Sequence, residues 1–122
     1  LSDRVGNTYT GESIEEFVSS ISHINLLSVG LNCSFGAAEM KPHLKQLKSV
    51  SPFFVTAYPN AGLPNGMGEY HETPKKMTAI IKEYLDEKLV NIVGGCCGTT
   101  PQHIASITKI VANATPPTPL AR

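Results

Sequence analysis

The sequence contains no tryptophan, only three cysteines and no excess of charge of either sign, because ten Lys and Arg residues balance ten Asp and Glu. Without a positive net charge, the chain lacks the attraction that holds proteins on phosphate backbones. The longest apolar runs extend about six residues, whereas a membrane-spanning helix needs about 20. The first ten residues, LSDRVGNTYT, lack the basic and apolar regions of a signal peptide. We therefore expect a soluble protein with neither nucleic acid nor a membrane as a partner.

An odd number of cysteines, two of them adjacent, does not fit a disulfide framework. The sequence thus predicts a reducing, cytoplasmic location. The 122 residues have room for one domain, and their 41% hydrophobic and 16% charged content is typical of a globular fold.

Amphipathic helical patterns recur along the chain. A helix is predicted over residues 13–22, where Ser13 and Glu16 have the spacing of a capping box. Another is predicted over residues 39–49, with Pro42 in its first turn. Two further helices are predicted to begin at Thr73 and Thr100, because each threonine precedes a proline at the first helical position. The last of these has an apolar stripe made by Ile104, Ile107, Thr108 and Val111.

Short apolar runs alternate with these helices, at residues 26–31, 53–58 and 89–93, and are typical of strands buried on both faces. Strands that alternate with helices form a parallel sheet with right-handed crossovers, so we expect an α/β fold. Residues 1–12 resemble a loop whose preceding strand is missing, and three strands leave both sheet edges open. We therefore expect the C-terminal part of a larger protein, either a doubly wound sheet or a (β/α)8 barrel.

All three cysteines lie at the predicted carboxyl ends of strands, where α/β proteins carry their functional sites. Cys33 follows the first strand by two residues, and Cys96 and Cys97 follow the third by three and four. Loops from alternate strands of a barrel can bring sulfurs to within ~4 Å, as zinc requires. Spacing alone leaves three interpretations open: a zinc site, inert buried thiols, or a redox-active pair.

The four histidines, His23, His43, His71 and His103, are not spaced for a shared metal site. We expect each to face solvent or fill the core, and the substitution His103→Ala to have little effect. No glycine motif for binding a nucleotide phosphate is present.

Two motifs make the sequence recognisable: GLNC at residues 30–33 and GGCCGTTP at residues 94–101. With them, residues 3–114 resemble the homocysteine S-methyltransferase family. The segments YPNAGLP at residues 58–64 and GEY at residues 68–70 are similar to the cobalamin-dependent methionine synthase branch rather than the betaine-using branch.

The resemblance implies the C-terminal half of a (β/α)8 barrel, with residues 1–114 in the homocysteine-binding domain and residues 115–122 as a Pro-rich linker toward a folate-binding domain. It implies that Zn²⁺ is held by Cys33, Cys96 and Cys97, with the homocysteine thiolate as fourth ligand. It places substrate contacts at Asn32, Asn60 and Gly62. The methyl group would come from methylcobalamin, which another domain of the same polypeptide binds, to give methionine.

Two alternatives stay open at this point. The methyl donor of the enzyme could instead be betaine or S-methylmethionine. The chain could also be a catalytically silent half-barrel that has only packing or assembly properties. Strands with open edges favour self-association. On either view, the isolated chain is expected to be inactive and to associate.

Overall fold

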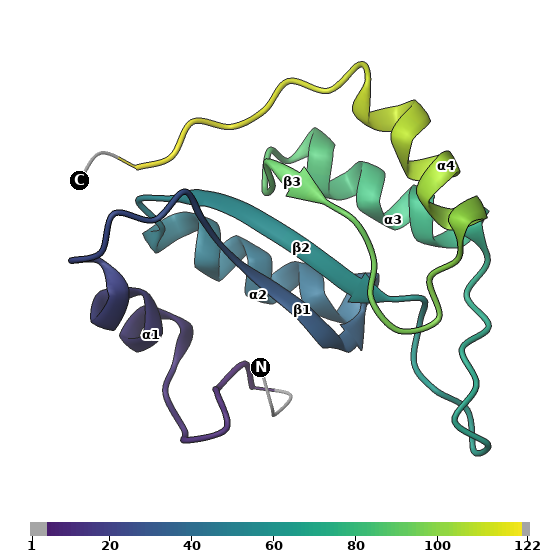
Figure 1. Ribbon diagram of the computed structural model, residues 1–122, viewed down its shortest axis with the longest axis horizontal. Helices are drawn as coiled ribbons and strands as arrows, with labels where there is room; N and C mark the ends of the chain where they lie inside the picture. The colour runs from purple at the N-terminus through teal and green to yellow at the C-terminus, as the bar shows by residue number, and fades with distance from the viewer. Residues whose placement is uncertain (1–4, 121–122) are drawn as a thin grey trace.

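The computed structural model describes residues 5–120 and shows a three-stranded parallel sheet in the order β1-β2-β3 (Figure 1). Helices alternate with the strands, which confirms the expected α/β fold. The elements in chain order are α1 (Ile14–Ile21), β1 (Ser28–Gly36), α2 (Ala37–Val50), β2 (Phe54–Asn60), α3 (Pro74–Asp86), β3 (Ile92–Val93) and α4 (Pro101–Val111).

The predicted helix starts at Ser13, Thr73 and Thr100 are confirmed. Ser13 Oγ accepts a hydrogen bond from the Glu16 amide at 3.2 Å, and the Glu16 carboxylate accepts one from the Ser13 amide at 3.0 Å. Thr73 Oγ1 accepts from the Lys76 amide at 3.2 Å at the start of α3, and Thr100 Oγ1 accepts from the His103 amide at 3.5 Å at the start of α4. Each of these helices has a proline in its first turn. Local hydrogen bonding therefore fixes these boundaries.

The prediction for α2 was wrong at its N-terminus. The helix begins at Ala37 rather than at residue 39, so Pro42 lies inside it, beyond the first turn. A proline there leaves the carbonyl of Ala38 without its helical donor. Both residues are exposed, so water can hydrogen-bond this part of the helix.

Two strand boundaries also differ from those predicted. β1 begins two residues later than expected and continues to Gly36, because its pairing with β2 resumes irregularly after Asn32. β3 contains only Ile92 and Val93, although backbone hydrogen bonds extend its contact with β2 by one residue on each side. Pairing between distant segments sets these ends, and residue patterns do not reveal it.

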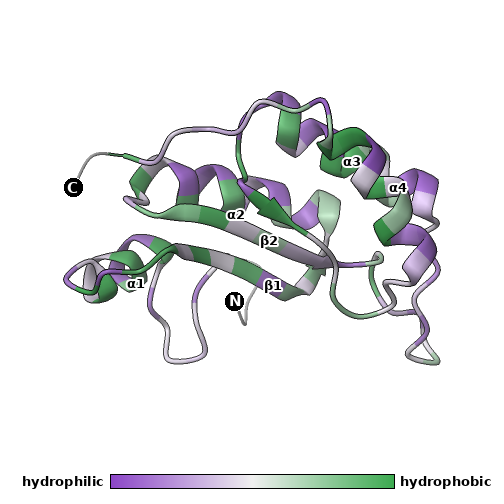
Figure 2. Ribbon diagram, turned by 45° about the horizontal axis from the view of Figure 1, so that its top comes forward, coloured by the Kyte–Doolittle hydropathy of each residue, from purple (hydrophilic) through white to green (hydrophobic). Residues whose placement is uncertain are grey.

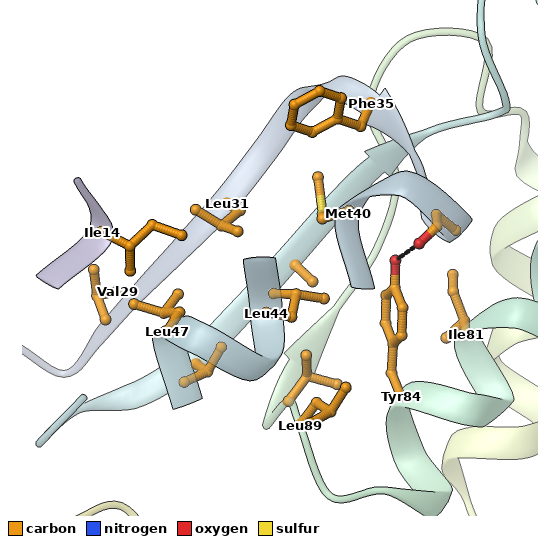
Figure 3. Close-up of a cluster of buried hydrophobic side chains, with 14 of the residues drawn as sticks. Ile14, Val29, Leu31, Phe35, Met40, Leu44, Leu47, Ile81, Tyr84 and Leu89 are labelled. Carbon is orange, nitrogen blue, oxygen red and sulfur yellow. Dashed lines mark hydrogen bonds between the residues drawn. The ribbon is translucent and has the colours of Figure 1, made fainter. Parts of the chain in front are cut away.

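The core lies between the sheet and α2. Val29 and Leu31 of β1 point toward Leu44 and Leu47 of α2, and all four side chains are buried (Figure 3). Tyr84 is fully buried on α3, and its hydroxyl donates a hydrogen bond to the Ala37 carbonyl at the start of α2. This bond fixes α3 against the helix that follows the first cysteine.

The expectation that the strands are buried on both faces was wrong. Phe54 and Ile92 are each 39% exposed. The hydrophobic strand β3 lies at one edge of the sheet (Figure 2). The predicted apolar stripe of α4 is also partly bare, because Ile107 is buried whereas Ile104 is 43% and Val111 40% exposed. No element among residues 5–120 covers these side chains.

The segment after α4 runs back along the molecule rather than away from it (Figure 1). The side-chain Nδ2 of Asn91 donates to the Pro117 carbonyl at 2.8 Å, and the Leu120 backbone amide donates to the Ser51 carbonyl at 3.3 Å. Its expected role as a linker to another domain stays a prediction. None of the described helices has both the length and the apolar character needed to cross a membrane.

Candidate metal centre

The structure brings together the three cysteines singled out in the sequence. Their sulfurs all lie within 4.8 Å of one another, and Cys33 Sγ is 3.5 Å from Cys97 Sγ. Two sulfurs bound to one tetrahedral zinc ion lie about 3.8 Å apart, since each Zn–S bond is about 2.3 Å long. All three side chains are half-buried and none is in a disulfide. The cluster therefore has the spacing of a metal site and remains accessible.

Cys33 reaches the cluster through an irregular turn of the backbone. The sequence had suggested that Cys33 lies in a loop after the first strand. In the structure it lies within the last part of β1. Cys33 and Ser34 have φ angles of 56° and 64°, in the left-handed region that residues with a side chain seldom adopt. The same residues interrupt the pairing of β1 with β2. Such strain persists only where surrounding contacts hold it, and it is common at functional sites.

Cys96 and Cys97 lie in the segment of residues 94–100, which we call the cysteine loop. The end of β2 holds this loop by backbone hydrogen bonds, from the Cys96 amide to the Pro59 carbonyl and from the Ala61 amide to the Cys97 carbonyl, each at 2.8 Å. Strand β2 therefore positions two cysteines that lie more than thirty residues further along the chain.

Glycines of the two motifs make room for side chains of β2. A Cβ atom at Gly30 would lie 1.6 Å from Thr56 Oγ1, and one at Gly94 would lie 2.8 Å from the ring of Tyr58. Any larger residue at either position would push β2 away from its neighbour. The glycines thus keep the strands that lead to the cysteines in close contact.

Asn60 contacts the cluster directly. It is buried, and its amide oxygen accepts a hydrogen bond from the Cys97 amide at 3.0 Å. Asn32 is exposed beside Cys33, and Gly62 packs against Glu72 with a φ angle of 86°. The structure thus assigns Asn60 a role in holding the cysteine loop, while substrate binding by Asn32, Asn60 and Gly62 stays a prediction.

The cysteines differ in acidity. The Ser34 amide, followed by hydrogen bonds from Cys97, Cys96 and Asn60, holds the pKa of Cys33 below its usual range despite partial burial. The hydrogen bond to Cys33 is the main cause that raises the pKa of Cys97, together with burial and the negative charge of Cys33. Of these two thiols, Cys33 therefore ionises more readily than Cys97.

Tyr70 is a neighbour of the cluster that the sequence reasoning did not identify as functional. Gly98 has a φ angle of 78°, and a Cβ atom there would lie 2.3 Å from Tyr70 Cβ, so the tyrosine packs directly on the cysteine loop. Burial raises the pKa of Tyr70 most, followed by the charge of Cys97 and a hydrogen bond to it. No sequence motif pairs Tyr70 with a residue 28 positions away.

His103 is the second residue whose role was missed. It is 5% exposed, and both of its ring nitrogens have partners. Nδ1 accepts from the Thr100 amide at 3.1 Å, and Nε2 lies 2.6 Å from the Glu72 carbonyl. His103 thus fills the core rather than facing solvent, and His103→Ala would remove both of these hydrogen bonds. The expected small effect of this substitution stays a prediction, which these contacts argue against. The capping-box spacing of Thr100 and His103 was the available signal.

The cluster also fits a bound group in two other respects. No further His, Cys, Asp or Glu within residues 5–120 joins the three sulfurs, so one tetrahedral position would stay free for an external ligand. The hydroxyl of Thr99, within the cysteine loop, is the buried side-chain oxygen in this part of the chain that has no partner. An unpaired buried hydroxyl is costly unless a ligand or water satisfies it.

Comparison with known proteins gives consistent matches. The sequence model of a family described as homocysteine S-methyltransferase matches residues 2–111. The homocysteine methyltransferase MmuM from Escherichia coli is similar in structure: its apo form has a TM-score of 0.64 and 21% identity, over 90% of this chain and 37% of that chain. Its metallated form has a TM-score of 0.65 and 21% identity, over 89% and 33%.

The chain thus spans about a third of the structures it matches. At this level of identity the likeness concerns the fold. It confirms the expected partial (β/α)8 barrel. It excludes the doubly wound sheet, the other architecture that the alternation of strands and helices had left open.

Proposed function

Because the chain belongs to the homocysteine S-methyltransferase family, we propose that it provides the zinc site and thiol-activating part of a methyltransferase that converts homocysteine to methionine. The observation that carries this proposal is the group of three thiols within 4.8 Å, from the end of β1 and the loop after β3. We assign Cys33, Cys96 and Cys97 as the zinc ligands.

The donor set suits zinc and suits catalysis. Three thiolates are soft ligands that select zinc over magnesium or calcium, and three protein ligands leave the open position of a catalytic site. Zinc bound there would keep the thiol of homocysteine ionised at neutral pH, where a free thiol is mostly protonated and unreactive.

The chain's own residues prepare this site for an ion and for a sulfur nucleophile. The lowered pKa of Cys33 favours its thiolate, which is the form that metal binding requires. Asn60 and the end of β2 fix the Cys97 backbone. Three cysteine thiolates carry more negative charge than a divalent cation can balance, so electron density stays on the substrate sulfur that accepts the methyl group.

For the methyl donor we favour methylcobalamin, held by another domain of the polypeptide and recharged through a folate-binding domain. The support is the similarity of residues 58–64 and 68–70 to the methionine synthase branch. Betaine or S-methylmethionine remains the alternative donor, and assays of the intact enzyme with each donor separate them. We also propose a cytoplasmic location and substrate contacts at Asn32, Asn60 and Gly62.

The zinc content of the purified protein tests the site. We expect about one zinc ion per chain, and adding homocysteine should release protons and increase the number of sulfur atoms around the metal in X-ray absorption. Cys96→Ala and Cys97→Ala should each lose the metal, because two thiolates seldom hold zinc tightly.

The matched control is His23→Gln, which changes an exposed side chain outside the cluster and should keep its zinc. A wild-type protein that contains no zinc, and whose three thiols all react freely with a thiol reagent, would contradict the proposed site in this chain.

A further inference from the structure

The loop between β2 and α3 is tied down at both ends beside the cysteines. The Glu72 amide donates to the Ala61 carbonyl at 3.1 Å, so residues 61–72 form a closed surface loop, which we call the 61–72 loop. Its first residue binds the Cys97 carbonyl, and Tyr70 near its end packs on Gly98. The loop therefore contacts the cysteine loop at two points.

One side chain links these two loops. His103, at the third position of α4, accepts through Nδ1 from the backbone amide of Thr100, a group that can only donate. This fixes the ring proton on Nε2, which then donates to the Glu72 carbonyl at 2.6 Å. The same ring also lies 2.8 Å from Thr100 Oγ1. His103 thus joins the last residue of the cysteine loop to the base of the 61–72 loop.

We propose that His103 is a positioning residue for the cysteine cluster. His103 holds the 61–72 loop in place, and this loop keeps Tyr70 packed against Gly98. The cysteine loop is thereby fixed so that Cys97 stays beside Cys33. The metal-related part of this inference rests on the proposed function. The contact between the loops does not, since it can be measured in protein without metal.

The geometry favours this role over a purely local helix cap. A cap needs only an acceptor for the Thr100 amide, which Glu or Gln at the same position would supply. The hydrogen bond from Nε2 instead reaches a residue 31 positions earlier in the chain, in a different loop. Residues that orient metal ligands from outside the coordination sphere change metal affinity by about 10–100-fold when replaced.

The test compares two substitutions that keep the cap. His103→Glu can accept from the Thr100 amide but cannot donate to the Glu72 carbonyl, whereas His103→Gln can do both. In zinc-free protein, the alkylation of each cysteine by iodoacetamide is followed by mass spectrometry. Zinc affinity is measured by competition with a chromophoric chelator, and a melting curve checks that each variant is folded.

We expect His103→Glu to raise the ratio of Cys97 to Cys33 alkylation several-fold and to weaken zinc binding by about 10–100-fold. His103→Gln should stay near the wild type, and His23→Gln, on an exposed histidine, should not differ from it. If His103→Glu does not fold, His103→Met replaces it and is compared with Thr100→Val, which alters the cap hydroxyl but keeps the bond to Glu72.

Equal effects of His103→Glu and His103→Gln, or an unchanged alkylation ratio in a folded His103→Glu, would overturn the proposal. The same holds for equal effects of His103→Met and Thr100→Val. A wild-type protein without zinc would contradict the proposed function alone, because the alkylation ratio still reports on the contact between the loops.

Discussion

Cys33 and Cys97 differ in acidity although their sulfurs are 3.5 Å apart. The Ser34 amide is the main group that lowers the pKa of Cys33, whereas the hydrogen bond to Cys33 is the main cause that raises that of Cys97. One thiol is thus prepared to be an anion while its neighbour keeps a proton. In metal-free protein, the negative charge of an ionised Cys33 therefore makes the loss of the Cys97 proton harder.

A pH series of alkylation tests this difference. A lowered pKa means that Cys33 becomes a thiolate at a lower pH than an ordinary thiol, and only the thiolate reacts. In zinc-free protein at neutral pH, we expect iodoacetamide to modify Cys33 before Cys97. As the pH is raised, the alkylation of Cys97 should accelerate at a higher pH than the alkylation of Cys33, since the pKa of Cys97 is raised. Mass spectrometry of the modified peptides gives the order, and Cys97 reacting first would refute the assignment.

The sequence revealed the cysteines but not everything that positions them. The motifs around Cys33, Cys96 and Cys97 identified candidate ligands because those motifs are short and local. Tyr70 and His103 act through contacts across 28 and 31 residues, to Gly98 and Glu72. Contacts between residues so far apart in the chain depend on which strands of the sheet pair with one another. The residue pattern of a single sequence does not reveal this pairing.

At the scale of elements, the helix starts that local hydrogen bonds determine were predicted well. The strand boundaries that depend on pairing with a neighbouring strand were not. Ser13, Thr73 and Thr100 cap their helices as expected, because a side-chain oxygen three residues before an amide is sufficient. By contrast, β1 continues to Gly36 because β2 lies beside it, and α2 consequently starts immediately after it. Pro42 was therefore placed too near the start of its helix.

Replacing Pro42 tests how α2 tolerates a proline in its interior. In Pro42→Ala the backbone amide returns and can donate to the Ala38 carbonyl, and alanine has the highest helix propensity. Loss of the rigid ring in the unfolded chain offsets part of the gain. We expect the free energy of unfolding to rise by about 1–2 kcal/mol.

Urea unfolding followed by circular dichroism measures this change. The matched control is Lys45→Arg, at an exposed position of the same helix, which keeps the positive charge beside Glu87 and alters helix propensity only slightly. A lower stability of Pro42→Ala than of the wild type would show that the proline ring contributes to packing that α2 requires.

At the scale of the whole molecule, the covered and bare faces of the sheet are unequal. The face toward α2 buries Val29, Leu31 and Val55, whereas Phe54 and Ile92 remain 39% exposed. A groove of about 440 Å³ runs between β3, α4 and residues 114–116, with Ile104 and Val111 in its lining. A (β/α)8 barrel buries the corresponding surfaces against further strands and helices. The chain also spans only about a third of the solved structures it resembles.

These bare surfaces predict that the 122-residue chain associates when it is produced by itself. Exposed apolar side chains beside an unpaired strand edge favour contact with another copy, because both the side chains and the backbone groups gain partners. In sedimentation equilibrium we expect an average mass above that of a monomer, increasing with concentration.

The double substitution Ile104→Lys and Val111→Lys should shift the chain toward the monomer, since it places two charges on the exposed side of α4. Met67→Lys is the matched control, because Met67 is 84% exposed on the 61–72 loop, away from the groove. A monodisperse wild-type monomer would mean that the open face of this sheet is stable in water without a partner.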